Sequence, residues 1–307
     1  MSLFWKQVLQ SLVFGLVLPG ILFSTVRKVP EAPVDPPTAQ TQIWIPVIGE
    51  DGRLRAMELE DYVFRVVLGE MPAGFHMEAL KAQAVAARTY TLWMVRTGDR
   101  HRGAVCTDFS CCQEYREPEA YLEAGGSGES VEKVLSAVEQ TRGQVLYYGE
   151  ELIMATYFAC AGGRTEDAAV VWGTNYPYLQ SVSSPETTGY DDDVVEVPVE
   201  DFWGALGCAP EDHLGSVIYT EGGGVASVSI GQQKYTGVEL RSLFGLRSTV
   251  FQLDVTDDKV LFRTKGFGHR VGLSQYGSDA LAQQGQRYDQ ILAHYYQGTT
   301  LGEVRND

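Results

Sequence analysis

The residue with the clearest chemical potential is Glu70, which lies where a predicted amphipathic helix ends, just before Pro72. Proline disfavours helical geometry in the residue before it, so the helix should stop there and leave Glu70 at the mouth of a loop. A second, alanine-rich helix is predicted from about His76 to Met94, and its Lys81 and Arg88 share one face. A carboxylate that faces two cations can build a polar cleft. From these residues alone, a salt bridge between Glu70 and Arg88 is the simpler interpretation.

A second chemical group occupies the segment HRGAVCTDFSCC, which holds His101, Cys106, Cys111 and Cys112. An imidazole and thiolates this close in sequence can hold zinc tetrahedrally. The spacing differs from that of a standard zinc finger. A disulfide from Cys106 to Cys111 or Cys112, or free thiols, are the alternatives. A zinc ion held by all four residues would be structural, because no position would remain for a catalytic water.

The elements that must position these residues are a mixture of helices and strands. A hairpin over 43–57 precedes the helix that ends near Glu70, and the acids at 58–61 suit the start of that helix. Because predicted helices and strands are segregated along the chain, the fold class is α+β, with a helical core and antiparallel β segments. Further helices are predicted at 130–140, 274–284 and 288–296, strands at 144–148, 152–159, 217–230 and 246–260, and a loop leading into a short helix at 191–202.

The N-terminal segment is predicted to be a membrane anchor. Val8–Val26 is an almost uncharged apolar run of 19 residues, which just spans a bilayer. A cleaved signal peptide is the alternative, although no clean small-x-small cleavage site follows. We therefore divide the chain into an anchor at 1–28, a proline-rich tether at 29–42, and a domain at 43–307 with a possible β-rich subdomain at about 186–262.

The composition narrows the class of partner. The chain has 307 residues, 44% of them hydrophobic, and a formal net charge of −16. This charge argues against nucleic acid and anionic lipid surfaces as main partners. It leaves a weakly charged sugar substrate possible, because a cleft can be locally basic.

Three stretches carry a resemblance to a known family. GEMPAGFHMEALKAQAVAARTY (Gly69–Tyr90) closely resembles the signature of the stage II sporulation protein D family of peptidoglycan lytic transglycosylases. TYFACAGGRTEDAAVVWGTNYPYL and GFGHRVGLSQYG resemble its Gly-Gly-x-Thr segment and its C-terminal motif. The resemblance covers the chain from about Ile43 to Gly298. It implies an anchored, extracytoplasmic enzyme that cuts glycan strands during engulfment, after a partner amidase/endopeptidase has removed the stem peptides, together with a membrane scaffold.

The resemblance also implies roles for residues. Glu70 would be the general acid and base, and the C6 hydroxyl of muramic acid would be the nucleophile, so a 1,6-anhydromuramyl end would form without a second carboxylate. Some members bind zinc through a Cys/His set, and no organic cofactor is implied. This chain departs from the family at Ala161, Arg270 and Cys111, where relatives often have serine, glycine and histidine. The expected substrate-binding residues are Lys81, Arg88, Tyr157, Gly162, Gly163, Thr165, His269, Ser274, Gln275 and Tyr276.

Two other functions remain open at this stage. A non-catalytic wall-binding protein could activate an amidase, as some relatives of this domain do, although such a protein would not need Glu70. Alternatively, the Cys/His set could hold a catalytic zinc in a hydrolase, in which case chelation would abolish activity at once. A cation beside Glu70 would lower the pKa of its carboxyl and oppose an acid role, unless burial outweighs it.

Overall fold

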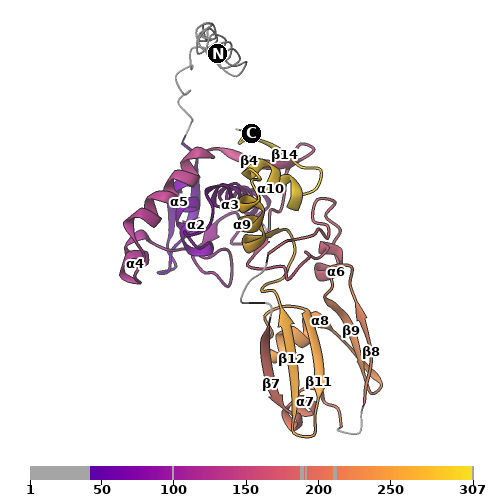
Figure 1. Ribbon diagram of the computed structural model, residues 1–307. Coiled ribbons are helices and arrows are strands. Elements are labelled where there is room, and N and C mark those ends of the chain that lie inside the picture. Colours follow the sequence, from indigo (N-terminus) through magenta and orange to yellow (C-terminus); the bar gives the residue numbers. More distant parts are fainter. Residues whose placement is uncertain (1–41, 99, 187–189, 191, 210–212, 306–307) are drawn as a thin grey trace, which may run out of the picture. The chain divides into compact units, whose positions relative to one another are not determined.

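Figure 1 shows a computed structural model of the chain, which describes residues 42–98, 100–186, 190, 192–209 and 213–305. The predicted anchor, and the predicted tether except for Gln42, lie outside these residues. Within the part of the chain that is described, no helix combines the length and the apolar character needed to cross a membrane.

The main core is built around helix α3, Met77–Thr97, which packs against four other helices and strand β4. Its alanines at 79, 82, 84, 86 and 87 are fully buried, and these small side chains let neighbouring elements approach from several sides. His76 caps the helix N-terminus and Gly98 ends it in a left-handed conformation. The helices around α3 are α2 (Leu59–Glu70), α5 (Gly128–Gln140), α9 (Gln275–Gln283) and α10 (Tyr288–Tyr295).

Three small sheets border this helical core. One has the order β2-β1-β3, with the β1–β2 hairpin antiparallel and β3 parallel to β1. Another has the order β14-β4-β5, and β13 pairs with β6 in a short parallel ladder. The strands are β1 (Trp44–Ile48), β2 (Leu54–Glu58), β3 (Val105–Cys106), β4 (Gln144–Tyr148), β5 (Glu151–Leu152), β6 (Tyr157–Phe158), β13 (Leu273–Ser274) and β14 (Thr300–Glu303).

A second hydrophobic cluster gathers around Phe202 and Phe262, both fully buried. Two antiparallel three-stranded sheets, β11-β12-β7 and β10-β9-β8, and two helices supply its residues. Both clusters belong to one compact unit that begins at Gln42. The elements are β7 (Asp193–Pro198), α7 (Val199–Leu206), β8 (Leu214–Tyr219), β9 (Val225–Ile230), β10 (Gln233–Thr236), α8 (Gly237–Phe244), β11 (Val250–Val255) and β12 (Lys259–Lys265).

The α+β class and the main helices are confirmed, and the differences from the predictions have local causes. Residues 193–198 form a strand rather than a loop, because their alternating side chains pack one face against the second cluster. The apolar run 217–230 holds two strands, with a turn at 220–224. Helix α8 was missed, although Thr236 and Glu239 form a capping box at its start. The short helices α4 (Pro118–Glu123) and α6 (Ala168–Trp172) were missed as well.

A buried ion pair ties α2 to α3. The Arg88 side chain has no exposed surface, and its Nη2 donates to Oε2 of Glu60 at 2.5 Å. Arg88 also donates to the carbonyl oxygen of Gln144, and Glu60 accepts from the N–H of Gly143. One charge pair therefore joins two helices to the start of β4.

We expect Arg88→Met to lower the free energy of unfolding by about 3–5 kcal/mol, because it leaves the Glu60 carboxylate buried without a cation. Chemical denaturation followed by circular dichroism measures this loss. The matched control is the double variant Arg88→Met/Glu60→Met, which removes both charges and should recover much of the stability. Unchanged stability in the single variant would show that the pair is not needed for folding.

Candidate functional site

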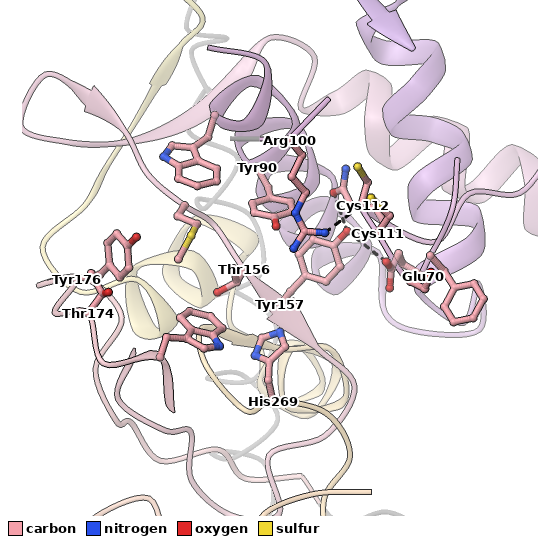
Figure 2. Close-up of a pocket in the computed structure, with 16 residues that line it drawn as sticks. Glu70, Tyr90, Arg100, Cys111, Cys112, Thr156, Tyr157, Thr174, Tyr176 and His269 are labelled. Carbon is pink, nitrogen blue, oxygen red and sulfur yellow. Dashed lines mark hydrogen bonds between the residues drawn. The ribbon is translucent and has the colours of Figure 1, made fainter. Parts of the chain in front are cut away.

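A cleft of about 580 Å³ opens beside the C-terminal end of α2 (Figure 2). Its described walls combine polar groups with several aromatic rings, and Glu70 is the one carboxylate among them. The lining residues are Glu70, Tyr90, Trp93, Arg100, Phe109, Ser110, Cys111, Cys112, Gln113, Met154, Thr156, Tyr157, Trp172, Thr174, Tyr176 and His269.

The Glu70 carboxyl is held by neutral donors. Its Oε1 accepts from the N–H of Glu114 at 2.8 Å, and its Oε2 accepts from Nε2 of Gln275 at 3.2 Å. The Tyr157 hydroxyl lies 3.4 Å from Oε1. Burial raises the pKa of Glu70, and the hydrogen bonds from Glu114 and Gln275, together with the nearby Tyr157 hydroxyl, offset only part of that rise. The pKa of this carboxyl therefore lies above its ordinary value.

The local sequence places Glu70 at this position. Helix α2 ends at Glu70, and Met71 is already extended ahead of Pro72, as predicted. Gly69 permits the close approach of the segment that supplies the Glu114 N–H. A Cβ at position 69 would lie 2.7 Å from Cγ of Glu114 and 3.2 Å from its backbone carbon. Any larger residue at 69 would push this donor away from the carboxyl.

Tyr157 and Gln275 reach Glu70 through the short β6–β13 ladder. Leu273 pairs with Tyr157 across it, so the start of α9 is fixed next to β6. Ser274 caps α9 by accepting from the N–H of Gly277 and donates its own proton to Glu186 at 2.9 Å. The fully buried Ser274 is therefore a structural N-cap that orients Gln275.

Tyr157 belongs to a hydrogen-bonded row. Its hydroxyl is 2.7 Å from Oε1 of Gln113, whose Nε2 donates to Thr91 at 2.9 Å. A hydroxyl has one proton, so the shorter contact identifies Gln113 as its main acceptor. Burial and the nearby Glu70 carboxylate raise the pKa of Tyr157, which keeps the phenol protonated.

The expected contact between Arg88 and Glu70 is wrong. Arg88 is fully buried against Glu60, so its side chain offers no surface to a substrate. Lys81 does not line the cleft either: its ammonium group lies 2.8 Å from Glu78. The seven-residue spacing correctly put both cations on one face of α3. The sequence pattern did not reveal that this face packs against other elements.

The other predicted substrate-binding residues are distributed unevenly. His269 lines the cleft and lies 5.3 Å from the Trp172 ring. Tyr276 packs edge-on against Phe75 at 4.9 Å and lies outside the cleft lining. Gly162, Gly163 and Thr165 also lie outside it, and Thr165 is fully buried.

His269 is a neutral group in the cleft wall. Burial, reinforced by the charge of Arg241, lowers the pKa of His269 to about 4. Its Nδ1 accepts from the N–H of Val271 at 3.1 Å, so the proton of the neutral ring sits on Nε2. This ring adds no charge to the cleft at neutral pH, and its remaining N–H is engaged by the backbone of Tyr157.

Arg270 stands where the family often has glycine, and the structure accounts for this departure. Its φ of 66° lies in the left-handed region that glycine adopts readily. The buried guanidinium pairs with Glu166 at 3.0 Å. It also donates to the carbonyl oxygens of Ala161, Arg164 and Gly222. These bonds offset the cost of the backbone conformation and fix the 161–166 turn.

The Cys/His set converges on one point beside the cleft. The ligand atoms of His101, Cys106, Cys111 and Cys112 all lie within 4.8 Å of one another, and the cysteines are unbridged. Donors around a tetrahedral zinc stand about 3.8 Å apart, given Zn–S bonds of about 2.3 Å. Burial raises the pKa of the Cys112 thiol to about 12. His101 has a φ of 48°, a strained backbone of the kind found at ligand sites. The four donors are therefore placed so that they could hold a metal ion, and sulfur and imidazole nitrogen are ligand types that zinc takes.

Several cleft residues were not identified from the sequence. Gln113 follows the Cys111–Cys112 pair and carries no chemical signal of its own, and the N–H of Glu114 carries no side-chain signal. Trp93 resembles an ordinary apolar residue of its predicted helix, and Trp172 lies in a segment for which no helix was predicted, so periodicity did not indicate that either ring lines the cleft. Arg100 lines the cleft as well, and its position next to His101 gave no sign of this in the sequence.

We expect Glu70→Gln to stabilise the protein at neutral pH by roughly 0.5–2 kcal/mol, because it removes a carboxylate from a buried site. A carboxyl whose folded pKa is raised loses stability as pH rises through that pKa. The difference between variant and wild type should therefore vanish below the ordinary glutamate pKa. Urea titrations between pH 4 and 8 test this, with the exposed Glu132→Gln as the control. A difference that is independent of pH would refute the raised pKa.

Comparison with known proteins identifies the family of this chain. The family model described as stage II sporulation protein matches residues 49–148. Stage II sporulation protein D of Bacillus amyloliquefaciens is 34% identical, over 91% of this chain and 84% of that protein. The protein of the same name from Bacillus subtilis is 36% identical, over 80% of this chain and 75% of that protein. An amidase enhancer of Bacillus subtilis is 29% identical, over 77% of this chain and 39% of that protein. With two relatives above 30% identity matched along most of their length, this chain belongs to the stage II sporulation protein D family.

Proposed function

We propose that this protein is a peptidoglycan lytic transglycosylase with Glu70 as its general acid and base. The observation that carries the proposal is a carboxyl with a raised pKa, held by neutral donors, as the one carboxylate among the described residues of an aromatic-rich cleft. An acid must be protonated near working pH to deliver a proton, and burial without a cationic partner favours that state.

The proposed reaction needs one carboxyl group. Protonated Glu70 gives its proton to the glycosidic oxygen as the bond from muramic acid C1 breaks, and the leaving sugar gains a hydroxyl. The resulting Glu70 carboxylate then takes the proton of the muramic acid C6 hydroxyl while that oxygen bonds to C1. The product is a 1,6-anhydromuramyl end, and Glu70 returns to its protonated form. The Glu114 N–H and Gln275 amide stabilise the carboxylate between the two steps.

The cleft walls support a glycan as the ligand. Trp93 stacks on Tyr90 at 5.9 Å, and Trp172 and Phe109 present exposed ring surface. Aromatic faces suit the apolar faces of pyranose rings, and the hydroxyl and amide groups between them suit sugar hydroxyls. By resemblance the substrate is glycan stripped of stem peptides. The setting is engulfment in sporulation, with a partner amidase/endopeptidase and a membrane scaffold. Residues 1–28 would anchor the enzyme outside the cytoplasm.

We expect the protein to convert denuded glycan strands to products with anhydro ends, and Glu70→Gln to lower kcat at least 1,000-fold while strands still bind. Mass spectrometry of the products and calorimetry of binding measure the two effects. In the wild type, kcat should fall as pH rises through the Glu70 pKa, because the acid form is required. The matched control Glu78→Gln changes a glutamate that pairs with Lys81 outside the cleft lining.

The outcomes separate three functions. Reducing ends without anhydro sugars would indicate a hydrolase that uses water. Binding without cleavage, combined with stimulation of a wall amidase, would favour the activator function that the name of the Bacillus subtilis amidase enhancer suggests for that relative.

We further propose that His101, Cys106, Cys111 and Cys112 hold one structural zinc ion. All four positions of a tetrahedron are then filled by protein, so the ion fixes the 101–112 loop that forms one wall of the cleft. The ion would also favour the thiolate form of the cysteines, which burial opposes.

We expect purified protein to contain about one zinc per chain, and Cys112→Ser to lower that content and the melting temperature together. Cys208→Ser, a cysteine outside the cluster, should change neither. Chelation should reduce activity only as the melting temperature falls. Immediate loss of activity at unchanged stability would instead support a catalytic metal.

A further inference from the structure

Arg100 is the charged cation of the cleft. Among the described lining residues it is the one lysine or arginine, because Arg88 and Lys81 make their ion pairs elsewhere. His269 adds no charge at neutral pH, since burial lowers its pKa to about 4. Figure 2 shows the Arg100 side chain among the residues that line the cleft.

The Arg100 guanidinium has most of its donors available. The residue is exposed, and its side-chain hydrogen bond among the described residues is a long one, 3.9 Å from Nη1 to the sulfur of Cys111. A guanidinium offers five N–H donors in a planar fork that matches a carboxylate. This group therefore differs from Arg88 and Arg270, whose donors are engaged by buried oxygens.

The proposed substrate offers one anionic group that a guanidinium can bind. Each muramic acid carries a lactyl side chain, which ends in a free carboxylate when the stem peptide is absent. When a stem peptide is attached, the same carbon is part of a neutral amide. A cation in the cleft can therefore distinguish the two forms of the glycan at the sugar itself.

We propose that Arg100 is a specificity-determining residue that binds the free lactyl carboxylate of muramic acid and so selects glycan strands without stem peptides. This inference rests on the proposed transglycosylase function and adds the group that selects its substrate. The competing explanation for Arg100 is structural: its contact with Cys111 could serve to stabilise a thiolate of the metal site.

The test compares two substrates that differ in one charge: denuded glycan strands, and the same strands after carbodiimide coupling of their lactyl carboxylates to methylamine. With wild-type protein, amidation should lower kcat/KM roughly tenfold to a hundredfold, mainly through KM, because it removes a charge-assisted hydrogen-bonded pair. Arg100→Gln should lower kcat/KM on the denuded, unamidated strands by the same factor, and it should no longer distinguish the two substrates. Arg100→Lys should retain part of the discrimination, because the lysine ammonium keeps the positive charge but lacks the planar fork of donors.

Arg102→Gln is the matched control, because it removes a positive charge from the same loop at an exposed position outside the cleft lining. It should behave as wild type. Equal activity of wild type on both substrates would overturn the proposal. An Arg100→Gln variant that loses zinc, or loses the same factor on both substrates, would assign Arg100 to the metal site and also overturn it.

A failure of the proposed transglycosylase function can be distinguished from a failure of the Arg100 proposal. If wild type cleaves neither substrate, calorimetric affinities of the full chain for the two strands provide the comparison. Tighter binding of the charged strands by wild type, lost in Arg100→Gln, would support the carboxylate site in a non-catalytic protein. Equal affinities would refute it.

Discussion

The geometry of the cleft depends on one electrostatic arrangement, a buried glutamate that is stabilised by neutral donors and kept away from cations. A guanidinium beside Glu70 would lower the pKa of its carboxyl and hold it ionised. The fold avoids this because Arg88 pairs with Glu60 in the core, and Lys81 pairs with Glu78 near the start of α3. Arg100 is the one arginine or lysine among the described residues that line the cleft, and it donates toward the sulfur of Cys111.

Several parts of this arrangement can be predicted from the sequence. Pro72 gave the end of α2 at Glu70, and the helix predicted at 274–284 corresponds to α9, whose N-cap is Ser274. These predictions succeeded because local backbone chemistry decides them. The partner of Arg88 was predicted incorrectly, because periodicity defines which residues share a helix face and says nothing about what packs on it. Residues 193–198 show the same limit, since tertiary packing made a strand of an acidic segment.

The cleft itself was only partly predictable. Tyr157 and Gln275 came from motif resemblance, and the structure brings both to Glu70. The Glu114 N–H could not have been found in this way, because a backbone donor leaves no trace in residue type. Arg270 illustrates the opposite case: the family pattern favours glycine there, but the surrounding carbonyl oxygens explain why an arginine with a positive φ is tolerated. Whether the remaining predicted residues bind sugar stays a prediction.

The link between Gln275 and Glu70 joins residues 205 positions apart in the chain, and the β6–β13 ladder that supports it joins Tyr157 to Leu273. Contacts of such large sequence separation form only after long segments have been brought together, which slows folding. Gln275 is also synthesised 205 residues after Glu70. A partly synthesised chain would hold Glu70 without its amide partner and without one wall of the cleft. The Glu70 carboxyl therefore acquires its amide partner only after Gln275 has been synthesised and the β6–β13 ladder has formed.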